Sequence, residues 1–580
     1  MSHSESLSAR WTRLRNRIAA RRAALLGAGV TRLVTPPEPR SIGLVARGRR
    51  LCAGRLVLGG HLVEAPGAML WDVAAPDAGF AAEAHGFGWL DDLAAAGDAA
   101  ARDRAQEWLW EWIARYGRGR GPGWAPELAG RRVIRWINHA AFVLRGQSPE
   151  AEAAFFRTLA VQARFLGWRW QAAAPGLARF EALTGLVHAG VSLEGMAHLA
   201  GEARAGLGRE CAQRIDAGGA IPSRNPEELL EVFTLLTWSA LALREAGQSP
   251  EEPHWRAVER IAPCLRALRH ADGGLARFHG GGRGLEGRLD AALAASGVAA
   301  RATGLAMGYA RLAGGRTSVI VDAAPPPAGE GSEGAHASTL AFELTSGRRP
   351  VIVNCGSGAS FGAEWRRAGR ATPSHSTLVL AGCSSARLSD DRRHPDRLSE
   401  APRDVPAQIT RGSERVTFEG GHDGYRQSHG LTHARRLDLA GDGRLLEGED
   451  MLLAIEAADK ARFDGALAAT RRHGLPFDIR FHLHPEVSAT PDETGTAVSL
   501  LLRSGEIWIF RVEGGAALAL RPGVYLEKTR LKPRAARQIV LSGLAVGYAT
   551  RVRWSLAKAP QTPVAIRDLA GEAPEPGTED

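Results

Sequence analysis

Residues 339–356 read TLAFELTSGRRPVIVNCG, the clearest strand–turn–strand pattern in the chain. Two runs of apolar and β-branched residues flank the polar turn SGRR, which is typical of an antiparallel hairpin. Similar short runs, separated by turn residues, occur on both sides of this stretch between residues 317 and 557, in TSVIVDAA, FDIRFHLHP and RQIVLSGLAVGYATRVRWSLA. We therefore expect antiparallel β structure, a sandwich or stacked sheets, over residues 311–558.

In the preceding part of the chain, the apolar residues recur with a different period. From about residue 85 to 300, apolar residues recur at helical spacing. In residues 223–247 (SRNPEELLEVFTLLTWSALALREAG), Asn225 suits the N-cap, Pro226 the first helical position and Gly247 the stop. The same spacing predicts helices over residues 91–115, 131–144, 149–170, 176–195, 252–270 and 285–295. Such a series must curl into a bundle, solenoid or toroid to bury its apolar faces.

These periods divide the 580 residues into four parts. Residues 1–84 form an N-terminal extension with the first helices, and residues 85–310 form the helical domain. Residues 311–558 form the β domain. The acidic, proline-rich segment 559–580 is expected to be disordered.

Composition narrows the classes of function. The chain is 44% hydrophobic and 23% charged, as in an ordinary globular protein. Lys plus Arg number 73 against 63 Asp plus Glu, with a pI near 9.9, so acidic polysaccharide, nucleic acid or anionic membrane would be attracted. The basic residues are scattered and no nucleic-acid-binding motif occurs, so nucleic acid is not expected. Five cysteines without a CxxC pair indicate neither a disulfide framework nor a thiolate zinc site.

The N-terminal residues are rich in arginine and lack the continuous apolar core of a secretory signal. No later segment reaches membrane-spanning length, so a cytoplasmic protein is the default expectation. Trp11, Leu14, Ile18 and Leu25 stand among arginines in an amphipathic pattern. This segment could lie on a membrane surface or pack as a first helix on the body, and the second interpretation is preferred.

Several motifs resemble the heparinase II/III family. GAHASTLAFELTSGRRPVIVNCGSG (residues 334–358) resembles its HAD-containing strand, RATPSHSTLVL (370–380) its aHNT strand, and GGHDGYRQSHGLTHARRLDL (420–439) its HdGY stretch. RRVIRWI and DAGGAIPSRNPEELLEV resemble its helical motifs. The resemblance implies an α+β multidomain fold, with an N-terminal α/α toroid followed by a C-terminal antiparallel β-sandwich. It also implies β-elimination of an acidic, uronate-containing polysaccharide bound between the two domains, and it leaves a periplasmic or envelope-associated location open.

The resemblance also implies catalytic residues. β-Elimination needs a group that neutralises the uronate carboxylate, a base for the C5 proton and an acid for the leaving oxygen. His336 stands at the HAD histidine, Tyr425 lies in the HDGY motif, and Arg224 matches the eRSP arginine. We expect Arg224 to pair with the carboxylate and the other two to share the acid and base roles.

Further residues are expected to contact substrate by motif position or by charge. They are His375, Arg370, Arg366, His422, His433 and Glu228. Each also has a structural explanation, because histidines in sheets are often satisfied core residues and arginine clusters often form a solvated face. An acid such as Glu228 in the first turn of a helix is favoured by the helix dipole.

This sequence departs from the family pattern at several positions. Leu177 and Ala178 replace the GNH asparagine and histidine, and Glu228 stands at the catalytic tyrosine. Ser338 and Ser376 replace the HAD aspartate and the aHNT asparagine, so a divalent metal is weakly supported and no cofactor is expected. The chain is therefore either a lyase that uses other groups or a glycan-binding or cell-envelope protein on the same scaffold.

Overall fold

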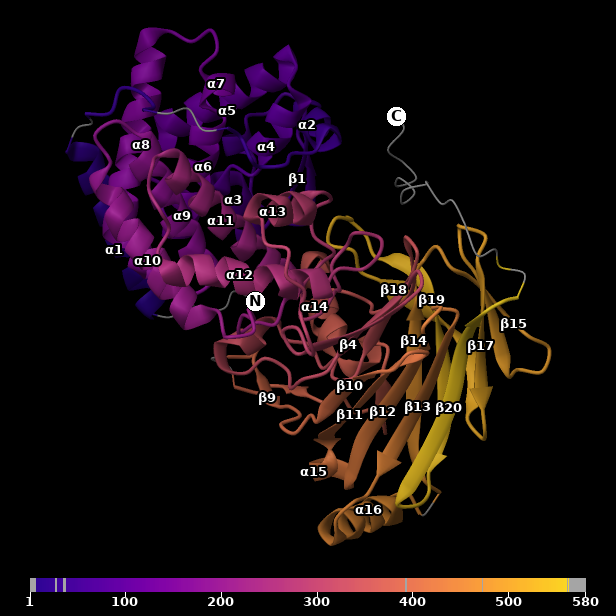
Figure 1. Cartoon of the computed structure of the whole chain (residues 1–580). Coiled ribbons are helices and arrows are strands. Elements are labelled where there is room, and N and C mark those ends of the chain that lie inside the picture. The colour runs from indigo at the N-terminus through magenta and orange to yellow at the C-terminus, as the bar shows by residue number, and fades with distance from the viewer. Residues whose placement is uncertain are drawn as a thin grey trace.

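The computed structural model describes residues 7–26, 29–34, 38–391, 394–471, 473–560 and 562. A helical half is followed by a half built of long strands (Figure 1). The predicted disordered tail lies, apart from residues 559, 560 and 562, outside the described residues. No described helix combines the length and apolar character needed to cross a bilayer.

The helical half curls into the expected toroid around an aromatic core. Trp89, Trp108, Trp112 and Trp136 are fully buried in it. A small hairpin of β1 (Arg55–Leu58) and β2 (His61–Glu64) lies among its first helices. The helices are α1 (Leu7–Leu25), α2 (Val45–Cys52), α3 (Ala78–Gly86), α4 (Trp89–Ala96), α5 (Ala99–Tyr116), α6 (Pro126–Asn138), α7 (Ala140–Val143), α8 (Pro149–Arg169), α9 (Leu177–Ser192), α10 (His198–Arg214), α11 (Pro226–Glu245), α12 (Glu252–Ala267) and α13 (Arg288–Ser296).

The N-cap predicted for α11 is confirmed, since the Asn225 side chain accepts hydrogen bonds from the backbone N–H groups of Glu227 and Glu228. The single helix predicted over residues 91–115 is wrong. The chain breaks after α4 at Gly97, whose φ of 69° is left-handed, and Asp98 caps α5 by accepting from Ala101 N at 2.8 Å. Sequence periodicity missed α10, which carries three glycines that lower helix propensity.

Helices α6 and α9 cross at a pair of glycines. A Cβ on Gly130 would lie 2.2 Å from the Glu181 carbonyl oxygen, and a Cβ on Gly185 would lie 2.5 Å from the Gly130 Cα. Only glycine permits this approach. The close crossing places Arg131 of α6 against Glu181 of α9, two residues that line the pocket described below.

The second half contains two antiparallel sheets of eight strands. The first has the order β10-β11-β12-β13-β20-β17-β16-β15. The second has the order β18-β19-β14-β6-β5-β4-β3, with β7 also pairing with β14. The bounds are β3 (Tyr309–Gly314), β4 (Thr317–Asp322), β5 (Phe342–Ser346), β6 (Arg349–Val353), β7 (Leu378–Leu380), β10 (Ala407–Arg411), β11 (Arg415–Tyr425), β12 (Leu431–Ala440), β13 (Leu445–Leu453), β14 (Leu475–Leu483), β15 (Ser488–Pro491), β16 (Ala497–Leu501), β17 (Ile507–Glu513), β18 (Ala517–Tyr525), β19 (Arg534–Ala545) and β20 (Ala549–Lys558).

The two sheets face each other across a shared aromatic core, as a sandwich requires. Phe342 of one sheet stacks on Trp554 of the other with ring centroids 5.9 Å apart, and Phe481 packs on Phe510 at 4.8 Å. Short elements decorate this body, namely α14 (Ala363–Arg370), α15 (Arg426–His429), α16 (Ala457–Ala469) and the pair β8 (Arg387–Leu388) and β9 (Leu398–Glu400). The hairpin expected at SGRR is confirmed as β5 and β6.

Polar contacts tie the two halves together. Arg224, just before α11, pairs with Asp322 at the end of β4, and Lys528, after β18, pairs with Glu227 of α11. The last helix before the sandwich ends at Ser296 and the first strand of the sandwich starts at Tyr309. The boundary proposed at residue 310 falls one residue after this start. The segment proposed as an N-terminal extension packs on the helical half, because α1 lies against α8.

Candidate functional site

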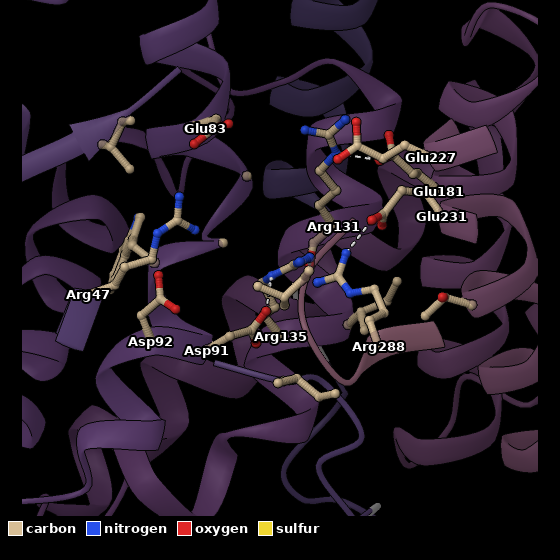
Figure 2. Close-up of a pocket in the computed structure, with 18 of the residues that line it drawn as sticks. Arg47, Glu83, Asp91, Asp92, Arg131, Arg135, Glu181, Glu227, Glu231 and Arg288 are labelled. Atoms are coloured by element: carbon tan, nitrogen blue, oxygen red, sulfur yellow. Dashed lines mark hydrogen bonds and ion pairs between the residues drawn. The ribbon is translucent and has the colours of Figure 1, made fainter. Parts of the chain in front are cut away.

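A pocket of about 510 Å³ opens in the helical half. Its walls come from α2, β1, α3, α4, α6, α9, α11 and α13, and Lys528 reaches it from the β half. Figure 2 shows arginine and carboxylate side chains turned toward one another across this cavity. The volume lies in the range of ordinary ligand pockets.

The lining is densely charged and balanced in sign. Trp89, Trp238 and several aliphatic residues supply its apolar part. The basic residues are Arg47, Arg50, Arg55, Arg131, Arg135, Arg288 and Lys528, and the acidic residues are Glu83, Asp91, Asp92, Glu181, Glu227, Glu228 and Glu231.

Most of these charges are held in place by partners. Arg135 Nε lies 3.0 Å from Asp91 Oδ2, and His139 Nε2 lies 2.9 Å from the other oxygen of the same carboxylate. Arg131 Nε donates to Glu181 Oε1 at 2.6 Å. Each of these pairs joins one arginine and one carboxylate of the pocket lining.

Two further ion pairs line the pocket, and one of them joins it to the β half. Lys528 Nζ donates to Glu227 Oε2 at 2.6 Å, and the same oxygen accepts the Gly282 N–H at 2.9 Å. Arg288 of α13 pairs with Glu231 of α11. The relative position of the two halves therefore affects the shape of the pocket.

Arg47 and Arg50 on α2 differ from the other cations. Neither forms a hydrogen bond or ion pair with another residue in the part of the chain that the structure describes. Arg47 stands beside Asp92 on one side of the cavity (Figure 2). Their guanidinium groups are thus available to a ligand with acceptor oxygens.

The neighbouring carboxyl groups of α4 have opposite pKa shifts. Burial raises the pKa of Asp92 to about 6. Burial also opposes ionisation of Asp91, but Arg135 and His139 hold its pKa below the usual value. Burial raises the pKa of Glu228 as well. Below about pH 6, Asp92 becomes neutral and the positive charge of Arg47 is left uncompensated.

The predicted catalytic histidine lies in the core between the halves and does not line the pocket. His336 is buried, its Nδ1 lies 3.0 Å from His375 Nε2, and its backbone N–H donates to His279 Nδ1 at 3.1 Å. Burial lowers the pKa of His336 well below its usual value and that of His375 to about 4. Both rings are therefore neutral, mutually bonded groups at physiological pH.

Arg224 binds a carboxylate of the protein itself. Its Nη2 donates to Asp322 Oδ1 at 2.6 Å, its Nε to the Met307 carbonyl at 3.0 Å and its Nη1 to the Pro325 carbonyl at 2.7 Å. Tyr309 donates to the Arg224 carbonyl at 2.6 Å. The guanidinium is committed to joining the two halves and does not line the pocket.

Tyr425 and the two histidines of its motif lie inside the sandwich. The Tyr425 hydroxyl donates to the Leu378 carbonyl at 2.9 Å, and burial raises the pKa of this phenol. His422 Nε2 lies 3.2 Å from His433 Nδ1, and His433 Nε2 lies 2.8 Å from Asp450. Tyr425, which was expected to share the acid and base roles, does not line the pocket.

The predicted arginine cluster forms internal contacts on α14. Arg370 is buried and donates to the carbonyls of Ala335, Ser332 and Asp396. Arg366 is partly exposed and lies 3.3 Å from the Asp396 carboxylate. Of the nine predicted site residues, Glu228 alone lines the pocket.

Sequence reasoning missed most of the pocket. Arg131 and Arg135 stand four residues apart in RRVIRWI, on one face of a helix, which is a signal that could have identified them. Arg47, Asp92 and Lys528 carry no motif, and only the fold brings them together. Among the described residues, no three His, Cys, Asp or Glu side chains are grouped so as to hold a metal ion.

The chain resembles known proteins over nearly its whole length. Residues 297–555 match the family described as "Heparinase II/III-like, C-terminal". The chain is 33% identical over 536 residues to FtsZ-localized protein C of Caulobacter vibrioides, covering 90% of each. Its fold is similar to heparinase III (TM-score 0.65, 13% identity, 90% and 87% of the two chains). It is also similar to a mutant of heparan sulfate lyase HepC from Pedobacter heparinus (0.58, 14%, 95% and 89%). The chain therefore belongs to the heparinase II/III-like family.

Proposed function

We propose that this protein binds a carboxylate-bearing oligosaccharide in the helical pocket without cleaving it through the histidine and tyrosine predicted from the family motifs. The observation that carries the proposal is the pair Arg47 and Arg50, which line the cavity without a hydrogen bond or close ion pair to another described residue, although Asp92 stands beside Arg47. The planar fork of arginine suits a uronate carboxylate. The protein carboxylates that line the pocket around these arginines accept hydrogen bonds from sugar hydroxyl groups.

The positions of the predicted catalytic residues support binding without elimination. A base must lie within hydrogen-bond reach of the proton that it removes. His336 and Tyr425 are buried, bonded to other protein groups and absent from the pocket lining. A sugar held beside Arg47 would therefore meet neither of them.

A second candidate function is elimination with a carboxyl group as base. Asp92, with a pKa of about 6, and Glu228, with a raised pKa, both line the pocket and hold protons more tightly than ordinary carboxyl groups. Enzymes that transfer protons typically use a base whose pKa lies near the working pH. This reaction would stop in Glu228→Gln or Asp92→Asn and persist in His336→Ala.

Removing the free guanidinium groups should weaken binding of uronate oligosaccharides. The double variant Arg47→Gln/Arg50→Gln loses two charge-assisted contacts, and we expect the dissociation constant to rise at least about tenfold. Calorimetric titration measures this change. Arg49→Gln is the matched control, because Arg49 lies on the same helix, is exposed and does not line the pocket. Equal affinity of the double variant and the control would refute the assignment.

The 33% identity to FtsZ-localized protein C over 536 residues supports a proposal about location, because the name of that protein places it with FtsZ. We infer that the protein gathers where FtsZ assembles. A fluorescent fusion at native expression level should overlap with labelled FtsZ at midcell in dividing cells. A uniform distribution in cells with intact FtsZ rings would contradict this inference.

A further inference from the structure

A second, smaller cavity adjoins the pocket in the helical half. Its volume is about 260 Å³, against about 510 Å³ for the pocket. Ile42, Thr234, Trp238 and Arg288 line both cavities, so the two share a wall. Arg288 stands across the pocket from Arg47 (Figure 2). The smaller cavity, which we call the side chamber, therefore adjoins the pocket on the side opposite Arg47.

The side chamber lies between α11 and α13. Trp238 and Leu241 line it from α11, and Ala291, Ala292 and Ala295 line it from α13. Positions 291 and 295 are one turn apart on the same side of the helix. Because alanine side chains are short, they leave open a space that larger residues would fill.

The polar groups that line the side chamber, apart from Trp238, already have partners within the protein. The Thr234 hydroxyl donates to a backbone carbonyl of its own helix at 2.7 Å. Both arginines of the lining form ion pairs, Arg40 with Glu245 and Arg288 with Glu231. No carboxylate is among the described residues of the lining. Sugar hydroxyl groups would be buried here without acceptors, which is unfavourable, so an apolar group fits better than a sugar ring.

Trp238 supplies one hydrogen-bond donor that has no partner. The residue is only 9% exposed, and its indole N–H donates to none of the described residues. Buried indole N–H groups usually have an acceptor. Because Trp238 lines both cavities, its N–H suits an acceptor oxygen of a ligand that extends from the pocket into the side chamber.

We propose that the side chamber binds an acyl group carried by the oligosaccharide whose carboxylate lies at Arg47 and Arg50. The acyl carbonyl accepts the Trp238 N–H, and the hydrocarbon chain lies between Leu241 and the alanines of α13. An acyl amide or ester offers one acceptor followed by a chain without polar groups, which matches this lining. The chamber is larger than an acetyl group, so longer chains gain more contacts. The inference rests on the proposed function, because the same ligand occupies the pocket.

Calorimetric titration with two disaccharides tests this inference. Each joins a uronate to glucosamine, and the glucosamine nitrogen carries an acetyl group in one and a hexanoyl group in the other. The parent protein should bind the hexanoyl compound at least about tenfold more tightly, because the longer chain removes more apolar surface from water.

Ala295→Leu should abolish this gain and leave the affinity for the acetyl compound within about twofold of the parent, because the added atoms fill the side chamber and not the pocket. Ala294→Leu is the matched control and should keep the gain, because Ala294 lies on the same helix, is exposed and lines neither cavity. Trp238→Phe keeps an apolar ring without the donor and should bind the hexanoyl compound about fivefold more weakly.

Equal affinity of the parent for the two disaccharides would overturn the inference and leave the proposed function standing. Binding of neither disaccharide would refute both. A gain that persists in Ala295→Leu would place the chain elsewhere. Hexanoate alone binding as tightly as the hexanoyl disaccharide would also overturn the inference, because the sugar would then contribute nothing. Unchanged thermal unfolding of the variants confirms that they fold.

Discussion

Asp450→Asn is expected to lower the free energy of unfolding by about 3–5 kcal/mol, because it leaves a buried guanidinium without its counter-charge. Asp450 is buried between the sheets, where Arg435 Nε and His433 Nε2 each lie 2.8 Å from its Oδ1. Trp554 donates to the other oxygen at 3.0 Å. Burial opposes ionisation of Asp450, but Arg435 and His433 hold its pKa well below the usual range.

Urea denaturation of the full chain measures this loss. Glu447→Gln is the control, since Glu447 lies on the same strand and forms an exposed pair with Arg415 at 3.8 Å. Exposed pairs contribute at most about 1 kcal/mol. If Asp450→Asn were no more destabilising than Glu447→Gln, the buried network would not stabilise the sandwich. Because the pKa is depressed, this stability is present above the unfolded carboxyl pKa and is lost as the pH falls through the folded value.

Arg224→Met should have an effect of similar size, about 3–5 kcal/mol, because it leaves the fully buried Asp322 carboxylate without its cation. It also removes the hydrogen bonds to the carbonyls of Met307 and Pro325, which join the helical half to the β half. The double variant Arg224→Met/Asp322→Asn should recover part of the loss, since the uncompensated charge is gone. Chemical denaturation of Arg224→Met, Asp322→Asn and the double variant provides the comparison. A double variant that loses the sum of both single effects would contradict this account.

The parts of the fold that depend on local rules could be predicted from the sequence. Asn225 before Pro226 marks a helix start because its short side chain reaches the next free backbone N–H groups, and the structure has this cap. The hairpin at SGRR follows from the alternation of apolar runs around a glycine turn, and β5 and β6 form it. The helix break at Gly97 was harder to predict from the sequence, because one glycine can lie inside a helix and another can end it.

The candidate site could be predicted much less well. Motif positions identified His336, His375 and Tyr425, but sequence alone does not tell whether a polar residue faces a cavity or joins two packed layers. The structure has these three in the core, where hydrogen bonds to other protein groups satisfy them. The pocket instead combines residues from α2 to the loop after β18, and this convergence depends on tertiary packing.

The most direct test of the central claim follows binding and cleavage in one experiment with the parent protein. Uronate oligosaccharides carrying a fluorescent label are titrated with the protein while anisotropy and the ultraviolet absorbance of unsaturated sugar are recorded together. We predict a saturable rise in anisotropy, reduced in Arg47→Gln/Arg50→Gln, with no growth in absorbance. Growth in absorbance that disappears in His336→Ala would contradict the claim, because a histidine buried outside the pocket would then be part of the catalytic machinery.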